Sequence, residues 1–173
     1  MPFINIAGST IKFKEVARVN HKKTILAISL ILASGAAICA KKENSSKPVD
    51  IVVYRSPTCG CCEKWLAHLK QNNFNIQDIV TDNVQAIKDK YGVSQEMASC
   101  HTAIVDGYVV EGHVPAKDIL TLLKTKPKVI GISVPGMPKG TPGMETGEAK
   151  DPYDVISFDR DKRFEIFSNH EKD

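Results

Sequence analysis

The chain has 173 residues, of which 42% are hydrophobic and 25% charged, and these values are ordinary for one soluble globular domain with a leader. Its formal net charge of +3 is small, and much of the positive charge lies between Lys12 and Lys23. No basic stripe follows this region, so the electrostatic footprint of a nucleic-acid-binding protein is missing. We therefore exclude a nucleic-acid partner.

The first 40 residues have the order of an export signal. A basic stretch that ends at His21-Lys22-Lys23 precedes an apolar run over residues 24–37. The run is short for a membrane span, so we interpret residues 1–40 as a secretory signal peptide, with an uncleaved N-terminal anchor as the alternative. Contact with a membrane is expected only if this leader is retained. An exported protein meets an oxidising compartment, where free thiols need a reason.

The rest of the chain divides into three parts. Residues 41–48 are polar and small and predict a linker, a domain covers 49–168, and 169–173 form a polar tail. Within the domain, the β-branched run 49–54 predicts a buried strand. Apolar side chains at helical spacing then predict a helix from Cys59 to about Asn72, and residues 75–80 predict a second strand.

Local signals also mark the next helix and a hairpin. Asp82 and Gln85 resemble a capping box that starts a helix, and Gly92 ends it. Asp106-Gly107 lies between two β-branched runs and predicts a tight hairpin over residues 102–111.

A helix, a loop and a second hairpin complete the domain. Pro115 predicts the first turn of a helix that ends before Pro127. Residues 134–144 are rich in Gly and Pro and predict an ordered loop, and 154–158 with 163–167 predict a hairpin. The order of elements predicts an α/β fold of thioredoxin-like type, with a central mixed sheet flanked by helices and an added C-terminal β-hairpin.

The motif Cys59-Gly60-Cys61-Cys62 lies where a strand and a turn lead into a helix. The dipole and free amide groups of a helix N-terminus stabilise a thiolate, so we expect the pKa of Cys59 to fall below the free-thiol value of about 8.5. A thiolate is the form that attacks disulfides and the form that ligates metal. Residues two apart on a helix point in different directions, so Cys59 has to lie in the turn for the three thiols to converge.

Two departures from a redox thioredoxin favour a metal site. A third thiol, Cys61, sits beside the second one. In addition, Ser99-Cys100-His101-Thr102 occupies the position where thioredoxins place a cis-proline against the motif. That proline keeps metals away from the motif, so its replacement by a fourth thiol reverses the effect.

Soft ligands select the metal. Thiolate and thioether groups favour Cu(I), zinc and iron–sulfur clusters, and the last is disfavoured because an unfolded exported chain carries no cofactor. The adjacent thiolates of Cys61 and Cys62 suit bridging between several ions better than one tetrahedral ion. A copper site also explains why Met137 and Met144 occur in the loop over residues 134–144, where few other apolar residues accompany them. Zinc is the alternative metal, and its ligands are then Cys59, Cys62, Cys100 and His101.

Five segments resemble the signature blocks of the CopG-type copper-resistance proteins, a family long classed as a domain of unknown function. They are Tyr54-x-Ser-Pro-Thr-Cys-Gly-Cys-Cys-x-Lys-Trp65, Ala98-Ser-Cys-His-Thr-Ala103, Val110-Glu-Gly-His-Val-Pro115, Val134-Pro-Gly-Met-Pro138 and Pro142-Gly-Met-Glu145. The resemblance covers about residues 50–168. It implies a periplasmic thioredoxin-like protein that binds a multinuclear copper cluster through its cysteines, with a proposed part in copper redox handling. Carried over to this sequence, it makes the metal ligands Cys59, Cys61, Cys62 and Cys100.

Plainer roles for the cysteines stay open at this point. In an oxidising compartment, Cys59 and Cys62 form a structural disulfide in the plainest interpretation. Cys61 and Cys100 are then buried packing residues, as free cysteines often are.

The remaining candidates have alternatives too. His101 is a ligand, a hydrogen-bond donor to a ligand or a loop residue, and His113 is favoured as a member of the site. Met137 and Met144 either pack the loop or contact the site. We expect His68 to be solvated.

The leading hypothesis is a periplasmic protein of copper tolerance that holds Cu(I) through cysteine thiolates and couples it to redox chemistry. Its expected partners are metal ions and a periplasmic copper or electron-transfer protein. A thiol–disulfide oxidoreductase is one alternative, in which Cys59 attacks a substrate disulfide and Cys62 resolves the mixed disulfide. A structural zinc-binding domain is the other. The sequence leaves open whether the protein is an enzyme.

Overall fold

The computed structural model describes residues 47–147 and 149–171. The predicted leader over 1–40 and most of the linker over 41–48 lie outside these ranges. Within them, none of the helices combines the length and the hydropathy that a bilayer crossing requires.

The order of strands and helices along the described residues follows the predicted one with two additions. The additions are β5 and the short 3₁₀ helix η1. The elements are β1 (Val49–Arg55), α2 (Gly60–Gln71), β2 (Phe74–Val80), α3 (Val84–Tyr91), η1 (Gln95–Met97), β3 (His101–Val105), β4 (Tyr108–Glu111), α4 (Ala116–Thr125), β5 (Gly131–Ser133), β6 (Tyr153–Phe158) and β7 (Phe164–His170).

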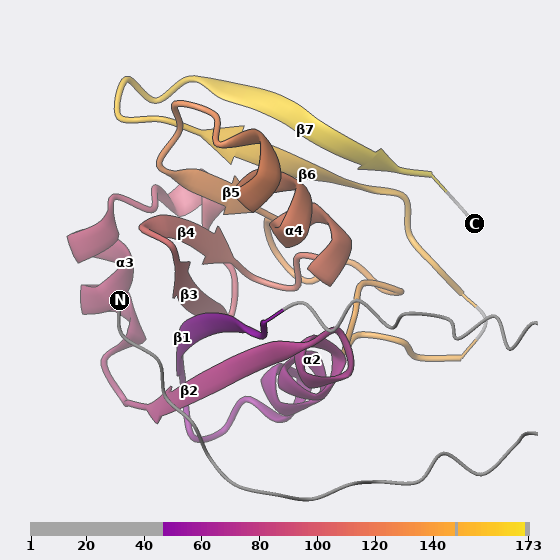
Figure 1. Ribbon diagram of the computed structural model, residues 1–173. Helices are drawn as coiled ribbons and strands as arrows, with labels where there is room; N and C mark the ends of the chain where they lie inside the picture. The colour runs from indigo at the N-terminus through magenta and orange to yellow at the C-terminus, as the bar shows by residue number, and fades with distance from the viewer. Residues whose placement is uncertain (1–46, 148, 172–173) are drawn as a thin grey trace, which may run out of the picture. The chain divides into compact units, whose positions relative to one another are not determined.

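All seven of these strands belong to one sheet in the order β2-β1-β3-β4-β5-β6-β7 (Figure 1). The pairs β1/β2 and β4/β5 are parallel, and the other neighbours are antiparallel. The predicted mixed α/β class is therefore confirmed. The C-terminal hairpin, β6 and β7, is confirmed as well, and β7 continues to His170 because its last residues pair with the start of β6.

Each face of the sheet buries its own apolar cluster. On one face, residues of β1, β3, β4 and β5 pack with Trp65 and Leu69 of α2 and with Ile119 and Leu122 of α4. The opposite face packs a smaller cluster around Val93 and Met97, which follow α3. The buried alternate positions of β1 supply the first face because successive side chains of a strand point to opposite sides.

The tight turn between β3 and β4 consists of Asp106 and Gly107, as predicted. Asp106 and Gly107 have φ angles of 45° and 83°. A two-residue turn whose twist matches that of the flanking strands needs positive φ at both positions, which Asp tolerates and Gly adopts freely.

One local prediction is wrong, and one strand was not predicted. The capping box at Asp82 and Gln85 is wrong: the side chain of Asn83 accepts the hydrogen bond from the Ala86 amide, and Gln85 instead donates to Asp89. Strand β5 has three residues, too few for an alternating pattern to be visible in the sequence.

The strand directions bring four connections to one end of the sheet. Strands β1, β4 and β5 run the same way, and β3 runs against β1 and β4, with Arg55 opposite His101 and Thr102 opposite Glu111. The residues that follow β1, β4 and β5 therefore lie at the same end as the residues that precede β3. This end carries every cysteine of the described residues.

We predict that Asn83→Ala lowers the free energy of unfolding by about 0.5–2 kcal/mol, because the variant leaves the Ala86 amide without its side-chain acceptor. Urea denaturation measures the difference. Asp82→Ala is the matched control and should leave stability almost unchanged. Equal losses in the two variants would contradict the assignment of the cap to Asn83.

Candidate metal centre

The first two cysteines meet across the start of α2. Cys59 is the residue before the helix, with a non-helical φ of −86° and ψ of 84°, and Cys62 lies in the first turn. Their sulfurs form a disulfide. Cys59 thus lies in the turn, as the convergence of the three thiols requires. The structure has the disulfide between Cys59 and Cys62 that the sequence left open as an alternative.

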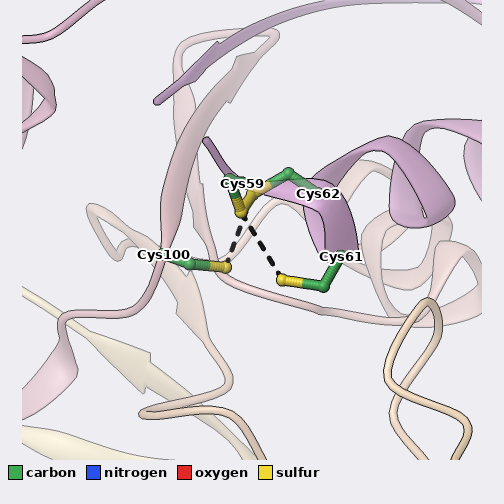
Figure 2. Close-up of side chains that lie close together, drawn as sticks. All are labelled: Cys59, Cys61, Cys62 and Cys100. Atoms are coloured by element: carbon green, nitrogen blue, oxygen red, sulfur yellow. Dashed lines mark hydrogen bonds between the residues drawn. A yellow bond between two sulfur atoms is a disulfide. The ribbon is translucent and has the colours of Figure 1, made fainter. Parts of the chain in front are cut away.

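Cys61 and Cys100 complete a cluster of four sulfurs (Figure 2). The Cys61 sulfur lies 3.5 Å from that of Cys59, and the Cys100 sulfur lies 3.6 Å from that of Cys62. Both Cys61 and Cys100 are free thiols of intermediate burial. All four sulfurs lie within 4.8 Å of one another, so two segments 38 residues apart supply one compact group of soft donors.

Cys100 is also in contact with two imidazole rings. Nδ1 of His101 lies 3.3 Å from the Cys100 sulfur, and Nε2 of His113 lies 3.1 Å from it. Both rings are fully buried. His101 and His113 thus join Cys100 in a second group of donors within 4.8 Å. The alternative zinc set of Cys59, Cys62, Cys100 and His101 stays a prediction.

Burial fixes the charge states of this group when metal is absent. Burial, followed by the electrostatic effect of the neighbouring Cys61, raises the pKa of Cys100 to about 12, so its sulfur carries a proton at neutral pH. Burial likewise lowers the pKa of His101 and of His113, so both rings are neutral. A cation that binds Cys100 must therefore displace a proton from it.

A hydrogen bond defines which nitrogen of the His113 ring is free. The Pro142 carbonyl only accepts, so Nδ1 of His113 donates to it at 2.7 Å and Nε2 carries a lone pair that faces the Cys100 sulfur. Nε2 of His101 is buried and has no hydrogen-bond partner in the described structure. The His113 lone pair points at the sulfur cluster and is a ready ligand.

The Gly- and Pro-rich loop after β5 packs against the start of α2. Gly143 has a φ of 85°, and a Cβ at this position would lie 2.7 Å from the Trp65 amide nitrogen and 2.9 Å from the Cys61 carbonyl oxygen. Only glycine permits this approach. The approach places the neighbouring Pro142 carbonyl where it orients His113.

The two methionines of this loop differ in exposure. Met137 is 55% exposed, and Met144 is partly buried. Their predicted contact with the metal stays a prediction. Trp65 of α2 is fully buried, and its ring centroid lies 4.2 Å from that of His101.

The expectation that His68 is solvated is wrong. It is half-buried, and its Nε2 accepts a hydrogen bond of 3.0 Å from the Ala116 amide at the start of α4. Burial lowers the pKa of His68, which favours the neutral ring that this bond needs. The contact joins α2 to α4 across 48 residues, and the sequence around His68 carries no sign of it.

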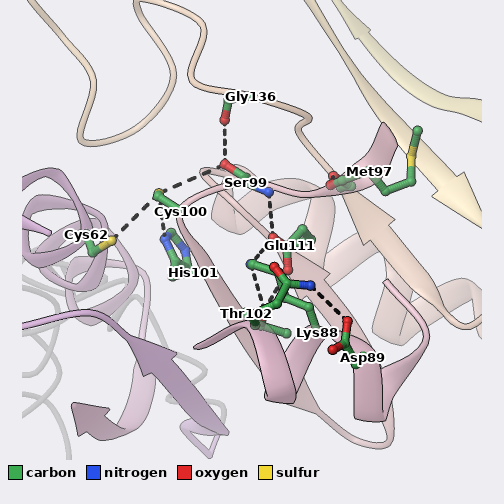
Figure 3. A network of polar contacts seen from close by, with 12 residues as sticks. Cys62, Lys88, Asp89, Met97, Ser99, Cys100, His101, Thr102, Glu111 and Gly136 are labelled. Atoms are coloured by element: carbon green, nitrogen blue, oxygen red, sulfur yellow. Dashed lines mark hydrogen bonds and ion pairs between the residues drawn. The ribbon is translucent and has the colours of Figure 1, made fainter. Parts of the chain in front are cut away.

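Lys88 of α3 and Glu111 of β4 form a buried ion pair near Cys100 that was not expected from the sequence (Figure 3). The exposed fractions of their side chains are 6% and 0%. One signal was available: Lys88 lies four residues after Val84 and three before Tyr91, on the apolar side of the predicted helix. A lysine in such a position needs a buried partner.

The cluster fits a soft metal ion. Thiolates and neutral imidazole are the ligands that copper and zinc share, and sulfur-rich sets favour Cu(I) among the copper ions. Cys59 and Cys62 can contribute only after their disulfide is reduced, because ligation requires thiolates. In the disulfide form, the free donors are Cys61, Cys100 and the lone pair of His113.

Comparison with known proteins identifies relatives. A family model described as a protein of unknown function, DUF411, matches residues 97–144. A solved structure named copper resistance protein CopG, form 2, has 42% sequence identity and a TM-score of 0.69, and the match covers 72% of this chain and 100% of that one. Form 1 of a protein with the same name has 43% identity and a TM-score of 0.68, with coverages of 71% and 98%. No curated protein sequence matches the chain.

We predict that part of the loss of stability on acidification comes from His68. Its pKa is lower in the folded chain than the ordinary 6.5, so below pH 6.5 the unfolded chain binds a proton that the folded chain resists. The stability that His68 contributes is therefore present above pH 6.5 and is lost as pH falls through this range. Urea midpoints at pH 7.5 and 5.5, measured with the disulfide intact, should fall less in His68→Gln than in the unsubstituted protein. An equal fall would contradict the prediction.

Proposed function

Because the chain belongs to the CopG family of copper resistance proteins, we propose that it binds copper in a role in copper tolerance and holds Cu(I) as the thiolate complex of four cysteines. The ligands are Cys59, Cys61, Cys62 and Cys100. The single observation that carries the proposal is the meeting of their four sulfurs within 4.8 Å.

Two features of this donor set support the binding of several Cu(I) ions. Thiolate sulfur is a soft ligand and prefers Cu(I) to harder ions. The ligands also include two neighbours in sequence, Cys61 and Cys62, whose sulfurs serve separate ions more readily than a single tetrahedral one. We therefore propose that several copper ions share bridging thiolates, with His113 as a nitrogen ligand at the edge through Nε2.

The proposal includes the fold type and the compartment. The order β2-β1-β3-β4, with β1 parallel to β2 and β3 antiparallel to both β1 and β4, supports a thioredoxin-like domain with an added hairpin. A periplasmic location rests on the sequence pattern of the leader. The copper or electron-transfer partner expected there belongs to the same proposal.

Copper uptake in this proposal depends on the redox state of the motif. Reduction of the Cys59–Cys62 disulfide takes two electrons and two protons from a dithiol and produces two thiols. Each thiol then releases its proton when its sulfur binds copper. The disulfide form has lost half of the sulfur ligands, so it holds copper weakly.

We predict that the reduced protein binds several equivalents of Cu(I) and that the disulfide form binds fewer. Metal analysis after anaerobic loading and gel filtration, together with a thiol count, measures both. Cys100→Ser should abolish most of the binding, because it removes the sulfur that closes the cluster from the second segment. His170→Gln is the control, since this histidine bonds to Asp118 outside the cluster. A reduced protein that takes up no Cu(I) would refute the proposed function.

A thiol–disulfide oxidoreductase is the second candidate, and the disulfide at a helix N-terminus is the observation that favours it. The Cys59 thiolate attacks a substrate disulfide and releases one substrate thiolate. The Cys62 thiolate then attacks the mixed disulfide and releases the second, so the substrate is reduced and the pair is oxidised.

Substitutions outside the pair separate the two candidates. An oxidoreductase should keep most of its disulfide reductase activity in Cys61→Ser and in Cys100→Ser, whereas a copper centre should lose metal in both. A reductase assay and a copper assay on the same preparations give the answer. Reductase activity that survives both changes, with no copper uptake in the unsubstituted protein, would favour the second candidate.

A further inference from the structure

The buried carboxylate of Glu111 has partners on both of its oxygens (Figure 3). One oxygen accepts from the Ser99 amide at 2.6 Å and from the Lys88 ammonium. The other accepts from the Thr102 hydroxyl at 2.7 Å, and Lys88 also donates to that hydroxyl at 3.1 Å. Three protein donors therefore occupy most of the roughly four lone-pair sites of the carboxylate.

Two of these partners lie on either side of Cys100 in the sequence. Ser99 comes immediately before Cys100, and Thr102 comes two residues after it. One side chain, fixed at the end of β4, therefore holds the chain on both sides of the Cys100-His101 pair. Lys88, on α3, fixes that side chain in turn.

The surrounding backbone leaves the same segment little freedom. The Gly112 amide donates to the His101 carbonyl at 3.0 Å, and Gly112 has a φ of 73°. A Cβ at Gly112 would lie 2.5 Å from the Ser99 hydroxyl oxygen. That hydroxyl donates to the Gly136 carbonyl. The segment before β3 is thus held from β4 and from the loop after β5.

We propose that Glu111, fixed by Lys88, is a positioning residue for Cys100: its carboxylate sets the backbone of residues 99–102 so that the Cys100 sulfur faces the sulfurs of the α2 motif. The inference rests on the proposed copper-binding function and adds to it a device outside the ligand set. Glu111 acts through the chain that carries a ligand and does not itself bind copper.

The energetics agree with a positioning role. A buried ion pair adds little net stability, because desolvation of both charges offsets their attraction, and apolar replacements of similar volume are often as stable. The hydrogen bonds to the Ser99 amide and the Thr102 hydroxyl are different, since they act on one segment and require an acceptor at one place. Hydrogen-bonding partners of this kind around a metal site typically change metal affinity about 10–100-fold when they are removed.

The test replaces the ion pair without leaving a buried charge. We expect Lys88→Met/Glu111→Leu to fold and, when reduced, to bind Cu(I) about 10–100-fold more weakly than the unsubstituted protein. The control Lys88→Met/Glu111→Gln also leaves no buried charge, keeps one carbonyl oxygen for the Ser99 amide and should lose much less. Competition with a chromogenic Cu(I) chelator gives the affinities, and the thiolate-to-copper absorption in the near ultraviolet reports the geometry of the bound ions.

A second measurement needs no copper. Hydrogen exchange of the Ser99 amide in the metal-free protein should be slow in the unsubstituted chain and in the control Lys88→Met/Glu111→Gln, and fast in the double variant Lys88→Met/Glu111→Leu. Asp118→Asn is the matched control: this buried carboxylate bonds to Ser168 and His170, so its loss should lower stability and leave both copper affinity and Ser99 exchange unchanged.

The outcomes are distinct. If the unsubstituted protein binds Cu(I) and the folded double variant binds it equally well, or keeps the Ser99 amide protected, the positioning role is wrong. If the unsubstituted protein binds no Cu(I), the proposed function fails and this inference fails with it. Should the double variant not fold, Thr102→Val removes one of the two bonds and should weaken binding by a smaller factor, and unchanged binding in that variant would also overturn the inference.

Discussion

The antiparallel register of β1 against β3 is the constraint on which the candidate centre depends. With Arg55 opposite His101, the chain that leaves β1 toward Cys59 and the chain that enters β3 after Cys100 lie side by side. A shift of one residue would turn the side chains of β3 to the opposite face of the sheet. The register itself is held by burial of Val53 and Ala103, which are paired in the apolar core. The same strand register therefore determines both the packing of the core and the position of the Cys100 sulfur.

The environment of Cys100 explains how one sulfur can serve two states of the protein. Without metal, burial keeps the thiol protonated, and the sulfur lies between Nδ1 of His101 and Nε2 of His113. A thiol so placed is inert in disulfide exchange, because its thiolate is scarce. A soft cation changes this balance by replacing the proton. Under the proposed function, the Cys59–Cys62 pair would carry the redox chemistry, and Cys100 would be the ligand that a soft cation deprotonates.

Local patterns predicted most of the elements. The hairpin at Asp106-Gly107 and the strand, turn and helix around Cys59 arise from interactions between residues close in sequence, and these parts match the structure. The cap of α3 was misplaced because Asp82 and Asn83 are both good capping residues, and the choice depends on where the first turn begins. His68 was misjudged because its partner is an amide 48 residues away that belongs to another helix.

The sequence by itself determined which groups are available in the domain over residues 49–168: four thiols, three of them in a turn-to-helix motif, and an α/β order of elements, together with motifs that resemble a known copper-resistance family. Only the tertiary structure decided how these groups are used. It joined Cys59 to Cys62, placed Cys100 between His101 and His113, and put Glu111 and Lys88 beneath the second cysteine segment. The physical reason is the separation in sequence between the residues that interact. Turn, helix and hairpin signals depend on residues a few positions apart, whereas a buried charge or an imidazole finds its partner through the pairing of strands and the packing of helices from distant parts of the chain.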